Sequence, residues 1–592
     1  MREHVDPTDR ARAVQAARGL CPFDLLLASG TVVDVGTGEL KPADVGIVGS
    51  LIASVHPRGS RADAADVIDC TGRWTAPGLI DMHVHFESSM LTPGAYAAAV
   101  CPRGTTTVFC DPHELANVAG VDGVRYAVDA SRRLPVRFIV QAPSCVPPQP
   151  GLELSGHDLY APDVAEMLSW DEVGGLAEVM DMLGVLGADD RMVGVVAAGL
   201  NAGKIVSGHA AGLTGPALEA YLAAGIDSDH ELFVDGDALA RLRAGMTVEL
   251  RGMMPSLLPG VIADLQHLAE LPTHIVACTD DLYAMTLLAD GGMDHLLRRL
   301  VAAGLPPVRA LRIATYHAAY RLGRTDLGLV AAGRQADLIV LSSLEEMWVD
   351  DVLCAGNRVA AGGRMLVPCE DAPADVPLAT MHLAALSPDD FTLRLPGHAD
   401  GRARVRTING VAVTAWGEAD VDIVGGAVVV PPGHILQAVV HRHGRIDARP
   451  HLGLLAAGWV GSDWTGAIAT TVSHDTHNLV VFGRDPDAMA AAANRVIAAG
   501  GGVAVARGRD VVASIDLPIA GILSPLPCHE VAELQRAVLD AALSVGLPTG
   551  AFTQPLLQVM TASLACLPGP HVTDVGVVDS TTGELVPDLV LA

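Results

Sequence analysis

The chain has 592 residues, about four times the length of a typical single domain, so we expect two or three domains. Half of the residues are hydrophobic and 18% are charged, a composition that can fill large cores and excludes a disordered protein. The formal net charge of −29 and the aromatic content of 4% disfavour binding to nucleic acid or to anionic membrane surfaces, and we expect neither partner.

Cysteine usage and the N-terminal segment predict a cytoplasmic protein. The ten cysteines are scattered and form no C-x-x-C pair, which is typical of reduced thiols. The first twenty residues mix both signs of charge and lack the apolar core of a signal peptide. Because no later run offers about 18 uncharged apolar residues, we predict neither secretion nor membrane insertion.

A small β domain is predicted from two distant sections of the chain. Short β-rich runs, separated by Gly, Asp and Ser turns, follow a charged leader in residues 1–77. Similar runs return in residues 329–375, beginning with GRQADLIVLSSL. We expect the two sections to complete one β-sandwich domain.

Residues 78–328 form an insertion between these sections and carry the pattern of a (β/α)8 barrel. Apolar strand-like runs alternate with Ala- and Leu-rich helical stretches, which is typical of a parallel sheet, and about 250 residues is the usual size of a barrel. The eight predicted strand runs are 79–86, 105–112, 136–143, 175–180, 204–210, 225–231, 247–252 and 274–281.

A third unit is predicted after the Pro- and acid-rich stretch at 367–377, which we interpret as a linker. Within residues 376–592, β-like runs such as NLVVFG alternate with Ala-rich helical runs such as PDAMAAAANRVIAAG. This alternation predicts a separate C-terminal α/β domain.

The clearest chemical signal is the pair His83 and His85 at the end of the first predicted barrel strand. Side chains at i and i+2 of a strand lie on the same face, so both imidazoles can bind one metal ion. A barrel places the C-terminal ends of its strands at one rim. The other polar residues near such ends are Glu178, His209, His230 and Asp280.

Each of these residues also has an ordinary structural interpretation when it is taken alone, such as a helix cap for His209 or an N-cap for Asp280. Their coincidence at corresponding strand ends favours one shared metal site. Histidine and carboxylate ligands without a nearby cysteine suit Zn, Fe or Mn. Glu178 can bridge two cations, and Asp280 can carry a proton from the attacking water to a leaving group.

Several longer runs carry a resemblance to a known family. They are APGLIDMHVHFESSMLTP, GTTTVFCDPHELANVAG, LAEVMD, SGHAAGLTG, IDSDHE and ACTDD. With these runs the chain resembles the adenine deaminases of the amidohydrolase superfamily. Two further runs, SHDTHNLVVFG at 473–483 and LPIAGILS at 517–524, extend the resemblance into the C-terminal region.

The resemblance implies hydrolysis of adenine to hypoxanthine and ammonia in purine salvage, by a metal-activated hydroxide that attacks C6. It implies a homo-oligomer and a binuclear divalent metal centre, with Mn or Fe favoured over Zn. Glu178 and Asp280 would act in catalysis, and a glutamate rather than a lysine at position 178 disfavours a carboxylated-lysine bridge. The implied metal ligands are His83, His85, Glu178, His209, His230 and Asp280.

Other polar residues around these motifs are candidates for binding the substrate, although a loop turn, an N-cap or an additional metal site also accounts for some of them. The candidates are Glu87, Ser88, Ser89, Asp111, His113, Glu114 and Asp281. In the C-terminal region, His474, Asp475 and His477 form a polar group that either closes the active site or has an unrelated structural role.

Two other functions compete with adenine deamination. The same metal centre would suit an amidohydrolase that acts on a cyclic amide or an N-acyl substrate. A catalytically inactive barrel kept as a binding protein would predict the loss of a ligand, but every ligand position is filled.

Overall fold

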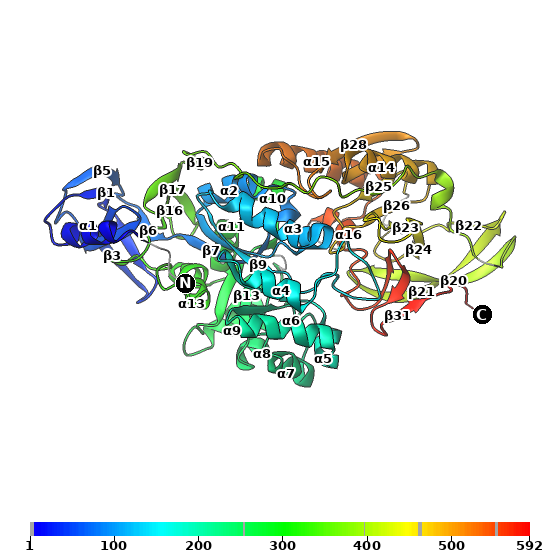
Figure 1. Cartoon of the computed structure of the whole chain (residues 1–592), viewed down its shortest axis with the longest axis horizontal. Coiled ribbons are helices and arrows are strands. Elements are labelled where there is room, and N and C mark those ends of the chain that lie inside the picture. Colours follow the sequence, from blue (N-terminus) through cyan, green and yellow to red (C-terminus); the bar gives the residue numbers. More distant parts are fainter. Residues whose placement is uncertain (1–4, 253–254, 396, 460–463, 551–553, 592) are drawn as a thin grey trace.

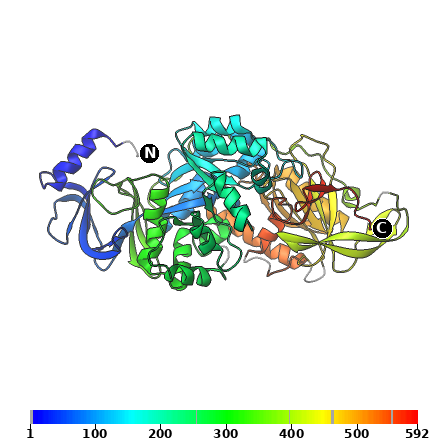
Figure 2. The same ribbon diagram turned by 90° about the horizontal axis from the view of Figure 1, so that it is seen from below.

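The computed structural model describes residues 5–252, 255–395, 397–459, 464–550 and 554–591. A sheet that contains the first strands, a central barrel and a C-terminal region follow one another along the long axis of the molecule (Figures 1 and 2). No helix in these described ranges combines the length and the apolar character needed to cross a membrane.

The first region is one ten-stranded sheet built from two sections of the chain, with helix α1 (Pro7–Ala17) packed beside it. Its order is β19-β18-β17-β16-β6-β2-β3-β1-β5, and β4 pairs with β3. The antiparallel pair β6 and β16 joins the early and late sections. The strands are β1 (Phe23–Ala28), β2 (Thr31–Asp34), β3 (Glu39–Val48), β4 (Leu51–Pro57), β5 (Ala64–Asp69), β6 (Trp74–Pro77), β16 (Leu338–Ser343), β17 (Trp348–Cys354), β18 (Asn357–Ala361) and β19 (Arg364–Met365).

Hydrophobic side chains from both sections share one buried core. Leu27 and Val45 from the early strands pack in the same cluster as Leu338 and Leu353 from the late strands. Burying such side chains is the main force that holds a sheet against a facing layer. The two sections therefore depend on each other for a complete core.

The barrel strands lie where the sequence predicts them, and every predicted run overlaps a strand. They are β7 (Leu79–His85), β8 (Thr105–Cys110), β9 (Arg137–Ala142), β10 (Val173–Val179), β11 (Ile205–Gly208), β12 (Ser228–Asp229), β13 (Thr247–Arg251), and β14 (Ile275–Cys278) with β15 (Asp280–Asp281). Strands β7 and β8 are buried along their whole length, as expected for parallel strands that are covered on both faces.

The strands form two parallel sheets, β11-β10-β9-β8-β7-β15 and β12-β13-β14. Because β14 and β15 are successive parts of the eighth strand, they link the two sheets on one side. On the other side, the backbone N–H of Asp227 donates to the carbonyl of Val206 at 3.2 Å, next to Gly208. A Cβ at Gly208 would lie 2.4 Å from the Ser228 carbonyl oxygen, so only glycine allows this approach. The predicted barrel is confirmed.

Twelve helices in the described ranges accompany the barrel strands. They are α2 (Pro93–Val100), α3 (His113–Ser131), α4 (Ala161–Leu168), α5 (Met182–Gly187), α6 (Asp190–Asn201), α7 (Gly215–Ala223), α8 (Asp237–Arg243), α9 (Leu258–Gln266), α10 (Ala284–Ala289), α11 (Met293–Ala302), α12 (Pro307–Arg312) and α13 (Ala318–Arg321).

Within the described residues, the C-terminal region combines a nine-stranded sheet, a three-stranded sheet and three α-helices. The large sheet has the order β22-β21-β20-β24-β23-β26-β25-β27-β28, and its pairs are antiparallel except for the β20–β24 contact. The predicted runs NLVVFG and PDAMAAAANRVIAAG correspond to β26 and α14. The elements are β20 (Gly401–Val411), β21 (Val413–Val424), β22 (Ala427–Val429), β23 (Ile435–Val440), β24 (His451–Leu455), β25 (Ala467–Thr470), β26 (Leu479–Gly483), α14 (Pro486–Ala499), β27 (Gly502–Arg507), β28 (Asp510–Asp516), α15 (Cys528–Val545), α16 (Pro555–Met560), β29 (Pro570–Thr573), β30 (Gly576–Asp579) and β31 (Glu584–Val586).

This region contacts the barrel through direct hydrogen bonds. Gln535 on α15 accepts from the backbone N–H of Met285 at 2.9 Å and donates to the carbonyl of Ser89 at 3.2 Å. Asn478 donates to the carbonyl of Leu154 at 2.8 Å. These contacts bring the loop between β25 and β26 to the rim of the barrel.

Candidate metal centre and active site

The six predicted ligands come together at the C-terminal ends of the barrel strands, and all of them are buried. We call this group the central cluster; it consists of His83, His85, Glu178, His209, His230 and Asp280. In β7 the side chains of His83 and His85 lie on the same face, as the two-residue periodicity of a strand predicts, and their Nε2 atoms are 3.0 Å apart.

Glu178, on β10, lies between two pairs of histidines. Its Oε1 atom is 3.5 Å from Nε2 of His83 and 3.2 Å from Nε2 of His85. Its Oε2 atom is 2.6 Å from Nδ1 of His209 and 3.3 Å from Nε2 of His230. Burial by itself would raise the pKa of Glu178, but His209 and His230 hold it well below its usual range. Glu178 is therefore an ionised carboxylate whose two oxygens face different histidine pairs.

Asp280 contributes a second carboxylate next to the histidines of β7. Its Oδ1 atom is 3.4 Å from Nε2 of His85, and Arg251 donates to its Oδ2 atom. Burial would raise the pKa of Asp280, but Arg251 lowers it well below its usual value. The backbone φ of Asp280 is +58°, a left-handed conformation that aspartate tolerates better than most residues.

Arg251 is a site residue that the sequence interpretation missed. It ends β13, and it also donates to Oε2 of Glu231 at 2.7 Å. The rule that placed Asp280 at the rim applies equally to Arg251, because Arg251 is the last residue of its strand. A search for charged residues at strand ends, and not only for metal ligands, could have found it.

Neighbouring groups fix the orientation of two of the histidines. Nδ1 of His85 donates to the carbonyl of Asp111 at 2.9 Å, which leaves the Nε2 lone pair facing the central cluster. The backbone N–H of His209 donates to the hydroxyl of Tyr221 at 2.9 Å, and that hydroxyl donates to the carbonyl of Val179.

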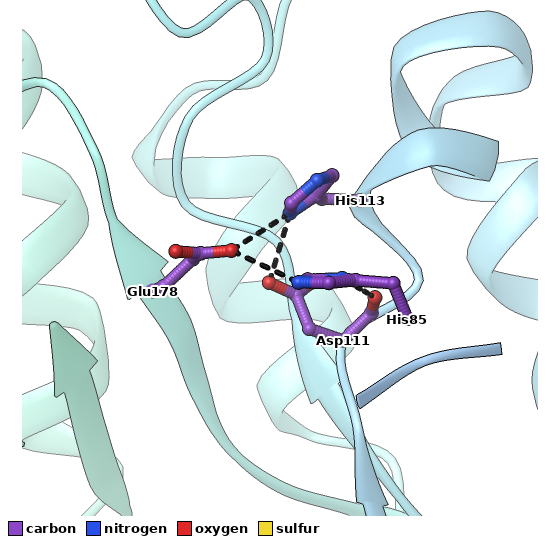
Figure 3. Close-up of side chains that lie close together, drawn as sticks. All are labelled: His85, Asp111, His113 and Glu178. Carbon is purple, nitrogen blue, oxygen red and sulfur yellow. Dashed lines mark hydrogen bonds and ion pairs between the residues drawn. The ribbon is translucent and has the colours of Figure 1, made fainter. Parts of the chain in front are cut away.

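Asp111 and His113, predicted as substrate-binding candidates, border the central cluster directly (Figure 3). Nδ1 of His113 is 3.0 Å from Oδ2 of Asp111 and 3.5 Å from Oε1 of Glu178. Burial by itself would lower the pKa of His113, but Asp111 outweighs it and the pKa rises to about 10. On the far side, Nε2 of His113 is 3.8 Å from Oδ1 of Asp475.

The segment after β7 forms the short 3-10 helix η1 (Phe86–Ser89). The substrate-binding candidates of this helix point in different directions. The Ser88 hydroxyl lies 2.7 Å from Oε1 of Glu114 and 2.5 Å from Oδ1 of Asp281. The Ser89 hydroxyl instead donates to the carbonyl of Phe86 within its own turn. Glu87 accepts from a backbone N–H at 3.4 Å, and burial together with Glu114 raises its pKa well above the usual value. The structure thus brings Ser88, Asp281 and Glu114 together, but not the Ser89 hydroxyl.

The C-terminal candidates also reach the barrel. Nδ1 of His474 lies 3.5 Å from Oε1 of Glu114, and Nε2 of His477 lies 3.5 Å from Oε2 of the same residue. A cavity of about 320 Å³ adjoins this side of the rim, between Asp281 on the barrel and Leu557 on α16.

The donor set of the central cluster fits divalent cations. Its donors are imidazole nitrogens and carboxylate oxygens, and His83, His230 and Asp280 converge closely enough to hold one ion, as do Glu178, His209 and His230. A parallel eight-stranded barrel with an H-x-H strand and a carboxylate between two histidine pairs at its rim defines the class of metal-dependent amidohydrolases.

Comparisons with known proteins agree with this class and narrow it. The amidohydrolase family model matches residues 74–359, and the model of the adenine deaminase C-terminal domain matches residues 411–584. An adenine deaminase of Klebsiella pneumoniae (strain 342) is 52% identical over 98% of this chain and 96% of its own length. "Adenine deaminase 2" of Rhizobium meliloti (strain 1021) is 51% identical over 98% of this chain and 97% of its own. An adenine deaminase of Ruegeria pomeroyi is 37% identical over 97% of this chain and 96% of its own.

The chain therefore belongs to the adenine deaminase family. This family membership confirms the resemblance that the sequence motifs indicate. It also identifies the chain as a hydrolase with a divalent metal centre. The alternative of an amidohydrolase acting on cyclic amides or N-acyl compounds is not favoured.

Proposed function

We propose that this protein hydrolyses adenine to hypoxanthine and ammonia at the central cluster. The observation that carries the proposal is the position of Glu178, whose two carboxylate oxygens each face a separate pair of histidines. Such a carboxylate can hold two cations side by side, the arrangement used in two-metal hydrolysis. The full-length similarity to adenine deaminases supports the choice of substrate.

One cation would be held by His83, His85 and Asp280 with Oε1 of Glu178, and the other by His209 and His230 with Oε2. Bound divalent ions would supply the acidification of water that hydrolysis needs at neutral pH. We propose Mn or Fe as the native ions, with Zn as the alternative, because the described donors are nitrogen and oxygen without thiolate.

Asp280 is the residue that we assign to proton transfer. Its Oδ1 atom faces the histidines, and its Oδ2 atom is held by Arg251, so the carboxylate is fixed and ionised before substrate arrives. It takes a proton from the attacking water and returns it to the departing amino group, so that water and adenine are converted to hypoxanthine and ammonia.

Ser88 and Asp281 lie where they can hold the purine ring. Adenine offers ring nitrogens that accept hydrogen bonds and one ring N–H that donates, and it carries no charge. The Asp281 carboxylate can accept from the ring N–H, and the Ser88 hydroxyl lies beside it, 2.5 Å from its Oδ1 atom. Asp281 also lines the cavity of about 320 Å³, which we assign as the approach route.

The test is ammonia release by the full chain after loading with Mn. We expect release from adenine at a rate far above that from a panel of cyclic amides and N-acyl amino acids. The Asp280→Asn variant, loaded in the same way, is the control for contaminating activity. If protein that holds at least two cations per chain releases no ammonia from adenine, the proposal is overturned. Size-exclusion chromatography of the same preparation tests the expected homo-oligomer.

A further inference from the structure

A second group of metal-type side chains lies outside the central cluster and shares no residue with it. It consists of Glu114 from the first turn of α3 and of His474 and His477 from the loop between β25 and β26, and we call it the second cluster. The three residues have exposed fractions of 0%, 5% and 0%. The function proposed above assigns no role to them.

Each member of the second cluster carries a buried polar atom without a hydrogen-bond partner. These atoms are Oε2 of Glu114, Nε2 of His474 and Nε2 of His477. Leaving a buried donor or acceptor unsatisfied costs about 1–3 kcal/mol, so one such atom on each of three neighbouring side chains requires an explanation.

The ring of His477 is oriented so that a lone pair faces the carboxylate. Its Nδ1 atom lies 3.2 Å from the carbonyl of Thr471, which can only accept a hydrogen bond. The N–H of Ser473 lies farther from the same atom, at 3.4 Å. When Nδ1 donates to this carbonyl, Nε2 carries a lone pair, and that atom faces Oε2 of Glu114 across 3.5 Å. In this tautomer a cation can bind between the two atoms.

Three carboxyl groups are concentrated around this gap. The Ser88 hydroxyl contacts Oε1 of Glu114 at 2.7 Å and Oδ1 of Asp281 at 2.5 Å, but it has one proton and can donate to only one of these carboxylates. Glu87 adds a third buried carboxylate, with one oxygen that has no partner. A cation among these groups would stabilise the ionised carboxylates, which burial alone disfavours.

We propose that Glu114, His474 and His477 bind a third divalent cation, separate from the two of the central cluster. Two imidazoles and one carboxylate are a common ligand set for zinc, and the same donors accept manganese. Ser88 orients the carboxylate from behind, as hydrogen-bonding partners of metal ligands usually do.

The bound ion would also connect two domains. Glu114 belongs to the barrel, whereas the loop with both histidines is fixed within the C-terminal region. There, His474 donates through its backbone to the carbonyl of Met560 at 2.8 Å, and Arg442 donates to the carbonyl of His477. The third cation therefore holds this loop against the barrel rim.

The experiment counts metal ions. The full chain is stripped with a chelator, reloaded with Zn²⁺ alone and separated from free metal, and bound zinc is measured per chain. We expect three ions in the unaltered protein and two in each of Glu114→Gln, His474→Gln and His477→Gln. The control is the His571→Gln variant, which should still bind three zinc ions. His571 is a buried histidine of the same region, and its ring nitrogens contact the carbonyls of Ala562 and Leu567.

Circular dichroism and thermal melting show whether each variant is folded. In the unaltered protein, the third equivalent of zinc should raise Tm by a few degrees, and this rise should be absent in folded His477→Gln. Two ions per chain in the unaltered protein, or three ions in folded variants of all three positions, would overturn the third site. Adenine turnover is measured on the same preparations. If the unaltered protein turns over adenine but binds only two ions, the third site is overturned and the proposed function stands. If it binds three ions but does not turn over adenine, only the proposed function is overturned.

Discussion

The central cluster and the second cluster use the same side-chain types but are assembled in different ways. The central cluster draws every member from strand ends of one barrel, so the parallel topology alone brings them together. The second cluster joins the start of a barrel helix to a loop more than 350 residues later, so it exists only when two domains are packed. The central cluster is therefore a consequence of the barrel fold, whereas the second cluster is a consequence of the interface between two domains.

The largest expected effect comes from Glu178→Gln, which removes the charge between the two histidine pairs. We expect both central cations to bind weakly. Adenine turnover should fall by about 10⁴-fold, because the loss of one member of a group of residues that act as a unit removes the contribution of the whole group. The second cluster should still bind one zinc ion, which metal analysis of the variant would measure. Glu166→Gln on α4 is the surface control, and equal losses in both variants would contradict the prediction.

Asp280→Asn tests proton transfer within the central cluster. We expect turnover to fall by about 10²–10⁴-fold, the usual contribution of a positioned acid or base. Most of the metal should stay bound, because His83, His85 and Glu178 are unchanged. Steady-state kinetics and metal analysis together check this, and an unchanged rate in metal-loaded variant would rule out the assigned role.

Arg251→Gln tests the positioning of Asp280. Arg251 touches no proposed ligand other than Asp280, so a loss of about 10–100-fold in kcat is expected, as for partners that orient metal ligands. Arg251→Lys should recover part of the rate, because it keeps a charge near Oδ2. If kcat is equally low in Arg251→Gln and Arg251→Lys, the contact between Arg251 and Asp280 has only a structural role.

Tyr221→Phe should have the smallest effect of the four. Removing the hydroxyl leaves the N–H of His209 and the carbonyl of Val179 without their partner, which costs about 1–3 kcal/mol of unfolding free energy. Urea denaturation would measure the loss. Tyr320→Phe, at an exposed tyrosine, should change stability by much less, and similar values for both variants would contradict the prediction.

The sequence predicts the position of the central cluster because most of the strands are apolar runs with a polar residue at or near the C-terminal end. The eight runs and the six candidate ligands follow from this local pattern, and the structure brings the candidates together. The contact between Arg251 and Asp280 was not predicted, since the pattern marks strand ends but not which charges will pair. The direction of the Ser89 hydroxyl depends on the turn of η1, which has no apolar periodicity to reveal it.

The second cluster could be predicted only in parts. The group around His474 and the group around Glu114 are both visible as polar motifs, but nothing local shows that they meet. Their contact depends on how Gln535 and Asn478 attach the C-terminal region to the barrel. Interfaces of this kind are set by three-dimensional packing, and spacing along the chain gives no measure of it.

The pairing of β6 with β16 has a consequence for biosynthesis. Strand β6 ends at Pro77 and β16 begins at Leu338, so the partner of β6 leaves the ribosome only after the whole barrel has been made. At about 5–20 residues per second, the early strands wait for more than ten seconds with an unpaired edge. During that interval the nascent chain exposes a surface on which other chains can pair, and a chaperone that binds extended segments would protect it.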